Sequence, residues 1–329
     1  MPDAISIRGV TKTFGNKYAV RDLDLVIPER SLCGLIGPNG AGKTTTIRMV
    51  MSIIFPDKGE IAVLGKKSAV ESKDRIGYLP EERGLYRKMK VGAFLHYVGR
   101  LKGVDDAGLQ VRVKEWLDRV GLGDTIKKKC EELSKGMQQK VQVLASIIHQ
   151  PDLIILDEPF SGLDPVNAKM LRELIDEQHQ RGATIIFSTH QMYQAETLCD
   201  RVVMIHQGKK VIDNTPQEIR ERHDPRTVLV TPALGPHADV ERAIRGVEGV
   251  DSLESINGSY LARAGEGDSP AAVLARIAAR VPVTRIELVR PTLEDVFIDI
   301  VEGDAPQEER EQLRAALAAD KARGDRGGD

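Results

Sequence analysis

The sequence predicts an α/β protein with two domains of unequal size, and three observations support that prediction. Short apolar runs such as Leu153–Leu156 alternate with helical patterns, which is typical of a parallel sheet. A glycine-rich turn near residue 40 lies between a buried-type strand and a helical pattern. The composition changes near residues 222–225, and a second series of strands and helices follows.

The first domain is expected over residues 1–222. Residues 5–27 alternate apolar and polar side chains, which predicts antiparallel edge strands. A short strand at 32–36 precedes the glycine-rich turn, and apolar residues at helical spacing follow the turn. Charged helical patterns predict a helical insertion over about 85–150. Buried strands separated by helices are predicted at 153–156, 183–188 and 201–205.

The second domain is expected over residues 225–302 as a small α+β unit. Its pattern is strand, helix, two strands, helix and strand, and Asn257-Gly258 predicts a tight hairpin turn between the paired strands. Residues 303–329 are rich in Gly, Asp and Arg, with a weak helical pattern over 307–323. We expect them to form a mobile polar tail.

The composition is that of a globular protein and excludes several functional classes. Of 329 residues, 41% are hydrophobic and 29% are charged, with a formal net charge of −2, so no nucleic-acid partner is expected. The three cysteines are widely separated, which excludes a disulfide framework and fits a reducing compartment. Because the chain lacks a signal peptide and any run of roughly 18 apolar residues, we expect a soluble cytosolic protein.

The glycine-rich turn matches the P-loop pattern GxxxxGK[ST]. Its glycines let backbone N–H groups approach phosphate oxygens, Lys43 would neutralise the β- and γ-phosphates, and the Thr44 hydroxyl would ligate Mg²⁺. Residues 16–19 lack the aspartate of a guanine-reading motif, so ATP is favoured over GTP. The sequence therefore predicts a P-loop NTPase core with ATP and Mg²⁺ as cofactors. The expected phosphate-binding residues are Gly37, Pro38, Asn39, Gly40, Ala41, Gly42, Lys43, Thr44 and Thr45.

Two carboxylates end the apolar strand at residues 153–156. An acid at the end of a buried strand is costly to desolvate unless it meets a cation or hydrogen-bond donors. With a P-loop in the same chain, Asp157 is expected to help hold Mg²⁺. Glu158 is expected to orient or deprotonate the attacking water.

Three further segments resemble motifs of the ABC ATPase family. Leu133–Met137 looks like the family signature sequence, and Ser161–Pro165 resembles the family's D-loop. His190, after a strand at 184–187, resembles its switch histidine. Together with the P-loop and the carboxylate pair, five motifs stand in family order across about the first 220 residues.

This resemblance implies a head-to-tail dimer with ATP between the P-loop of one subunit and the signature of the other. Nucleotide contacts in that dimer would include the signature residues Ser134, Lys135 and Gly136 and the D-loop residue Asp164. His190 would contact the γ-phosphate as a catalytic residue.

Some positions depart from the family pattern or leave a choice open. Phe14 aligns with the family's adenine-stacking aromatic, although the nearby Tyr18 competes for that role. Lys135 and Met137 replace Gly and Gln of the usual signature, and Glu81 replaces a Mg²⁺-contacting Gln. A carboxylate can also ligate Mg²⁺, so Glu81 is kept as an implied metal ligand. These changes resemble a bacterial exporter subgroup of the family.

The second domain resembles the small extension of exporter-type ABC ATPases related to sodium and drug efflux systems. The resemblance is clearest at residues 291–297, and dimer support or regulation is the expected role.

The leading hypothesis is the ATP-hydrolysing subunit of an ABC exporter. It would act as a homodimer on a separate multi-span permease that holds it peripherally on the inner face of the cell membrane, and residues 81–91 are the expected docking surface. One alternative is a soluble ABC ATPase acting on ribosomes or DNA, which a single P-loop disfavours. A second alternative is a nucleotide-binding regulator that does not hydrolyse ATP, but the Asp157-Glu158 pair argues against this alternative.

Overall fold

The computed structural model describes residues 2–82, 84–222, 226–233, 238–265, 267–289 and 292–304. These residues form two compact units, one ending at Pro216 and the other beginning at Gln217. Within the described ranges, no helix is both long enough and apolar enough to cross a membrane. Residues 303 and 304 of the predicted mobile tail end a helix that spans Leu293–Asp304, and residues 305–329 lie outside the described residues.

The first unit is built on a six-stranded sheet, as the alternation of apolar runs and helices predicts. Its strand order is β5-β6-β7-β3-β8-β9, and only β9 runs antiparallel to its neighbour. The strands are β3 (Leu32–Ile36), β5 (Ile76–Leu79), β6 (Leu153–Asp157), β7 (Thr184–Thr189), β8 (Arg201–His206) and β9 (Lys209–Asn214). The three central strands β3, β6 and β7 are buried along their whole length, which explains their continuous apolar sequence.

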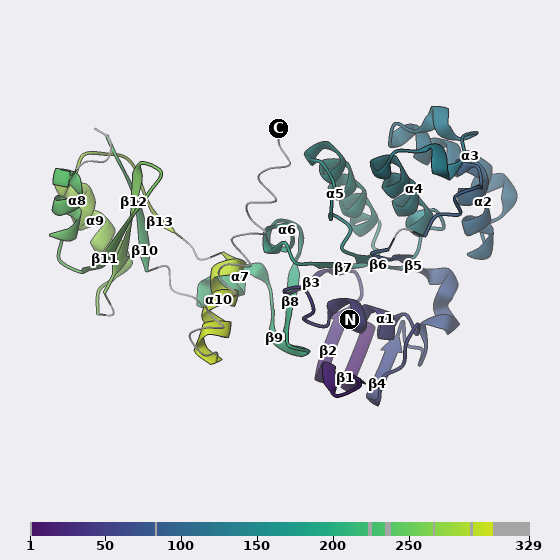
Figure 1. The fold of residues 1–329 in the computed structure, drawn as a ribbon, viewed down its shortest axis with the longest axis horizontal. Helices are drawn as coiled ribbons and strands as arrows, with labels where there is room; N and C mark the ends of the chain where they lie inside the picture. The colour runs from purple at the N-terminus through teal and green to yellow at the C-terminus, as the bar shows by residue number, and fades with distance from the viewer. Residues whose placement is uncertain are drawn as a thin grey trace. The chain divides into compact units, whose positions relative to one another are not determined.

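Helices cover both faces of this sheet (Figure 1). On one face lie α4 (Lys135–Ile147), α5 (Pro165–Gln180) and α6 (Met192–Leu198), and on the other lies α1 (Lys43–Val50). Because the parallel strands end at a common edge, the turns that follow β3, β6 and β7 meet there. Those turns carry the P-loop, the carboxylate pair and His190.

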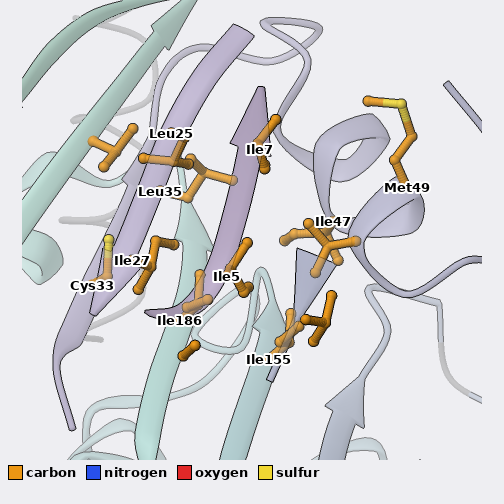
Figure 2. Close-up of a cluster of buried hydrophobic side chains, with 14 of the residues drawn as sticks. Ile5, Ile7, Leu25, Ile27, Cys33, Leu35, Ile47, Met49, Ile155 and Ile186 are labelled. Carbon is orange, nitrogen blue, oxygen red and sulfur yellow. The ribbon is translucent and has the colours of Figure 1, made fainter. Parts of the chain in front are cut away.

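The predicted antiparallel edge strands form a sheet of their own. Its order is β2-β1-β4, with β1 at Asp3–Phe14, β2 at Lys17–Pro28 and β4 at Lys58–Val63. Figure 2 shows how this sheet, α1 and the six-stranded sheet share one apolar core. The labelled core residues are Ile5, Ile7, Leu25, Ile27, Cys33, Leu35, Ile47, Met49, Ile155 and Ile186.

The predicted helical insertion comprises α2 (Val91–Leu101), α3 (Asp106–Arg119) and α4. Asp105 caps α3 by accepting a hydrogen bond from the Gly108 N–H. Outside this insertion, one further helix of the region, α7 (Pro216–Arg222), follows β9.

The second unit has the predicted α+β pattern in the order βαββαβ. Its antiparallel sheet has the order β11-β12-β10-β13, which is a ferredoxin-like topology. The apolar face of this sheet packs against two helices, and the predicted turn residues Asn257 and Gly258 both have positive φ, as a tight hairpin requires. The elements are β10 (Thr227–Pro232), α8 (Ala238–Arg245), β11 (Val250–Ile256), β12 (Ser259–Ala264), α9 (Pro270–Arg280), β13 (Val283–Val289) and α10 (Leu293–Asp304).

Candidate nucleotide-binding and hydrolysis site

The P-loop needs glycine at two positions for steric reasons. Gly37 has φ +148°, and a Cβ there would lie 2.1 Å from the Ile205 carbonyl oxygen. Gly42, the N-cap of α1, has φ +112°, and a Cβ there would lie 2.4 Å from the Ala19 carbonyl oxygen. The loop is therefore pressed against its neighbours, and its backbone follows a path that a side chain would block.

Lys43 is held within the loop. Its side chain is 5% exposed, and its Nζ donates hydrogen bonds to the carbonyl oxygens of Gly37 at 2.8 Å and Pro38 at 3.2 Å. Nζ also lies 3.5 Å from Glu158 Oε1. The buried ammonium group is thus paired and ready to exchange these partners for phosphate oxygens.

A cavity of about 490 Å³ opens beside the P-loop, which is a volume typical of small-molecule sites. It brings six of the nine predicted phosphate-binding residues together with Phe14, Glu81 and Glu158, which come from distant parts of the chain. Gly37, Pro38 and Ala41 are not among the residues that line it. Tyr18 also lines it, so the choice between the two aromatics stays open: Phe14 is 56% exposed and Tyr18 is 51% exposed. The full lining is Phe14, Lys17, Tyr18, Ala19, Asn39, Gly40, Gly42, Lys43, Thr44, Thr45, Glu81 and Glu158.

Asp157 and Thr44 form a site that fits Mg²⁺. The Thr44 hydroxyl donates to Asp157 Oδ1 at 3.2 Å, while Asp157 Oδ2 is buried and has no hydrogen-bond partner. Burial raises the pKa of Asp157, although hydrogen bonds from Ser188 and Thr44 oppose that shift. Among the described residues no cluster of three acidic, His or Cys ligands exists.

Glu158 adopts a strained backbone and a charged side chain. Its φ is +49°, a conformation that costs a non-glycine residue free energy and often marks a functional position. Burial opposes the charge, but the contacts with His190 and Lys43 outweigh it, so the pKa of Glu158 is lowered. His190 Nδ1 lies 2.9 Å from Glu158 Oε2. The predicted water-activating base and the predicted switch histidine therefore meet in one contact.

The signature and D-loop segments lie next to each other. Ser134 caps α4 as predicted, accepting a hydrogen bond from Met137 N at 3.3 Å, and Asp164 caps α5 by accepting one from Asn167 N at 2.9 Å. A Cβ on Gly136 would lie 3.3 Å from Asn167 Nδ2. None of the described residues that line the P-loop cavity comes from the signature, so the structure does not bring Ser134, Lys135 or Gly136 to the phosphate site of the same chain.

Ser188 and Gln139 are contacts that sequence reasoning gave no role. Ser188 donates to Asp157 Oδ1 and accepts from Glu158 N. Gln139 on α4 donates to the Pro159 carbonyl oxygen at 2.8 Å, directly after Glu158. The one available signal for Ser188 was a hydroxyl following an apolar strand, next to a motif histidine.

The P-loop, the carboxylate pair and the cavity define an ATP-binding protein of the P-loop class, and comparisons with known proteins agree. Residues 20–161 match the model of the family "ABC transporter", and residues 215–301 match "ATP-binding protein DrrA1-3-like, C-terminal domain". The chain is 40% identical over 299 residues to the uncharacterized ABC transporter ATP-binding protein YhaQ of Bacillus subtilis, covering 90% of this chain and 98% of that protein. It therefore belongs to the ABC transporter ATP-binding proteins.

Other relatives and a solved structure support the same family. The chain is 39% identical to the ABC transporter ATP-binding protein NatA of Bacillus subtilis, over 62% of this chain and 84% of NatA. It is 31% identical to the linearmycin resistance ATP-binding protein LnrL of the same organism, over 76% of this chain and 81% of LnrL. A solved ATP-binding subunit of an ABC transporter superposes with a TM-score of 0.63 at 30% identity, covering 67% of this chain and 92% of that structure. Like the family, the chain is an ATPase that hydrolyses ATP to power transport.

Proposed function

We propose that two copies of this chain close head to tail around ATP and Mg²⁺ and drive a separate multi-span permease in the export direction. The observation that carries the proposal is that the signature segment does not line the cavity that holds the P-loop motif. The P-loop, Glu81 and Glu158 share one cavity, and none of the described residues lining that cavity comes from the signature. A second copy would supply Ser134, Lys135, Gly136 and the nearby Asp164.

Within each site, the chain's own residues perform separable tasks. Backbone N–H groups of the P-loop and Lys43 bind the phosphates, and Thr44 and Asp157 hold Mg²⁺, with Glu81 facing the same cavity. When bound, Mg²⁺ supplies charge neutralisation at the phosphates. Glu158 orients the water and accepts its proton, while His190 holds the Glu158 carboxylate and contacts the γ-phosphate.

We place the adenine ring between the P-loop and the hairpin that joins β1 and β2, because residues of both line the cavity. Phe14 is our first choice for stacking, because it lines the cavity and is 56% exposed. Asp57 fixes this hairpin by accepting hydrogen bonds from Lys12 Nζ at 2.8 Å and Thr13 N at 2.7 Å. A base stacked on Phe14 would contribute about 1 kcal/mol.

We place the permease against an aromatic cluster in which two exposed rings, Tyr86 and Tyr97, lie beside the buried Phe94. The Tyr86 ring lies 5.7 Å from that of Tyr97 and 6.1 Å from that of Phe94, and 55% of Tyr86 is exposed. Partly exposed aromatic groups are enriched in protein interfaces. Tyr86 follows Glu81, a residue that lines the nucleotide cavity, by five positions in the chain.

The direction of transport is proposed from relatives. LnrL is named for resistance to linearmycin, and a 35% identical relative from Burkholderia lata is named Nod factor export ATP-binding protein I. We propose that the chain likewise acts in export.

We also propose an ATPase domain over residues 1–222 and a dimer-supporting or regulatory domain over 225–302. The permease would hold the chain peripherally on the cytoplasmic side of the membrane.

Purification of the tagged full chain from detergent-solubilised membranes tests the proposal. A multi-span protein should co-purify in stoichiometric amount, and Tyr86→Ala should reduce its recovery. Tyr193→Ala is the matched control, because Tyr193 is 67% exposed on α6, away from the aromatic cluster in sequence. Recovery of ribosomal or DNA-associated proteins, with the chain absent from membranes, would overturn the permease and support a soluble ATPase.

A further inference from the structure

Ser188 occupies the end of β7, directly opposite Asp157 in the register of the parallel pair β6–β7. Its side chain is fully buried, and Asp157 is 1% exposed. The position is therefore closed to solvent and to bound nucleotide. Any role of Ser188 in the reaction must act through its neighbours.

The hydroxyl group of Ser188 makes two hydrogen bonds whose polarity is fixed. The backbone N–H of Glu158 can only donate, so Ser188 Oγ accepts that bond, at 2.9 Å. Its single hydrogen then goes to Asp157 Oδ1, at 2.5 Å. One side chain thus joins the backbone of one site residue to the carboxylate of another.

The bond to Glu158 offsets a conformational cost. Glu158 has φ +49°, a region that non-glycine residues occupy only at a cost in free energy. A buried backbone N–H without a partner would add a further desolvation penalty. By accepting from this N–H, Ser188 stabilises the conformation that directs Glu158 toward Lys43 and His190.

The bond to Asp157 fixes the rotation of its carboxylate. Ser188 and Thr44 both donate to Oδ1, whereas Oδ2 is buried without a partner. Rotation of the carboxylate would break both bonds. The two bonds thus fix the plane of the carboxylate and leave one of its two equivalent oxygens without a hydrogen-bond donor, and that oxygen is the one suited to a metal ion or a metal-bound water.

We propose that Ser188 is a positioning residue that sets both the metal-facing rotation of Asp157 and the strained backbone of Glu158. The proposal rests on the functions proposed above for Asp157 and Glu158. It assigns the coupling of the two carboxylates to one hydroxyl group, so the metal site and the water-activating base are aligned together.

The test compares Ser188→Ala and Ser188→Thr in the full chain with a matched control, Ser146→Ala. Ser146 is also a buried serine, but its hydroxyl donates only to the Val143 carbonyl oxygen within α4. We expect Ser188→Ala to weaken Mn²⁺ binding, followed by electron paramagnetic resonance with ADP present, by about tenfold. The kcat for ATP should fall by about 10- to 100-fold. Binding of a fluorescent ATP analogue in EDTA should stay unchanged.

Ser188→Thr returns the hydroxyl group and should recover Mn²⁺ binding and kcat, whereas Ser146→Ala should change only the melting temperature. Wild-type values of both Mn²⁺ affinity and kcat in Ser188→Ala would overturn the proposal. If Ser188→Ala fails to fold, Ser188→Cys replaces it, because a thiol of similar size is a weak hydrogen-bond donor. Equal Mn²⁺ binding by the Cys and Thr variants would then overturn the proposal.

A wrong role for Glu158 and a wrong role for Ser188 would give different results. Normal hydrolysis by Glu158→Gln would contradict the function proposed for Glu158. The Mn²⁺ measurement on Ser188→Ala would still decide whether Ser188 orients Asp157, because it does not depend on turnover.

Discussion

His190 Nδ1 lies 2.9 Å from Glu158 Oε2, while the other carboxylate oxygen, Oε1, lies 3.5 Å from Lys43 Nζ. The carboxylate is therefore held between two basic groups, one from the P-loop and one from the turn after β7. Despite burial, these contacts lower the pKa of Glu158. Phosphate oxygens that draw Lys43 away would change the surroundings of Glu158 at the moment of nucleotide binding.

Replacing Glu158 by Gln should abolish most turnover without removing nucleotide binding. Gln keeps the size of the side chain but cannot accept a proton from water, so kcat should fall by about 10²- to 10⁴-fold. Steady-state ATPase assays and filter binding of labelled ATP measure the two properties separately. Unchanged turnover would remove Glu158 from the role of general base.

His190→Ala should lower kcat more than it raises KM for ATP. The substitution removes the contact that orients the Glu158 carboxylate, while Lys43 and the P-loop backbone remain. A loss of roughly 10²-fold in kcat is expected for a group that acts mainly in the transition state. An equal effect on ATP binding would show instead that His190 contributes to ground-state affinity.

Gly37→Ala should destabilise the first unit strongly. The added Cβ would lie 2.1 Å from the Ile205 carbonyl oxygen, so the loop or β8 must move, at a cost of roughly 3 kcal/mol. Gly65→Ala is the control, because Gly65 also has positive φ, +73°, but a Cβ there meets nothing within 4 Å. Thermal unfolding should separate the two variants, and similar melting temperatures would refute the steric argument.

Stability should fall as the pH drops from about 6.5 to 4 because of His149. Burial, with nearby Lys102, lowers the pKa of His149 to about 4, below the ordinary value of 6.5. Between these values the unfolded chain binds the proton and the folded chain does not, so the free energy of unfolding rises with pH. The contribution of His149 is present above pH 6.5 and lost as the pH falls toward 4, by up to about 3 kcal/mol.

His149→Gln tests this contribution, because an amide can still donate to the Ile76 carbonyl oxygen that His149 Nε2 contacts at 3.1 Å. Urea unfolding followed through Trp116, the single tryptophan, reports on the first unit. The variant should show a shallower pH dependence than the wild type. If the free energy of unfolding depended on pH equally in the variant and the wild type, the loss of stability in acid would belong to groups other than His149.

The local elements could be predicted from the sequence, but the pairing of strands that are distant in the chain could not. The P-loop, the Ser134 cap and the Asn257-Gly258 turn depend on residues adjacent in the chain, and the structure contains them as predicted. The separate sheet of β1, β2 and β4 and the antiparallel β9 depend on long-range pairing, which alternation alone does not specify. The fold class was nevertheless predictable, because continuous apolar runs are typical of buried parallel strands.

The residue types of the site could be predicted from the sequence, but the prediction of their contacts was incomplete. The motif residues Lys43, Asp157 and Glu158 do meet at one edge of the sheet. The contribution of Ser188 was not visible, because it depends on the register of β6 against β7 and on the unusual φ of Glu158. Neither the register nor the backbone angle leaves a pattern in the sequence of a single chain.

The register of β10 against β13 brings the two ends of residues 227–289 close together. The first strand of the second unit, β10, pairs with its last, β13, and Thr227 lies opposite Val289. The points where the chain enters this four-stranded sheet, at Thr227, and leaves it, at Val289, are then only about 5 Å apart. A gene deletion spanning this segment could be sealed with a few codons for flexible residues, and the same segment could be transplanted between coding sequences by recombination at two neighbouring points.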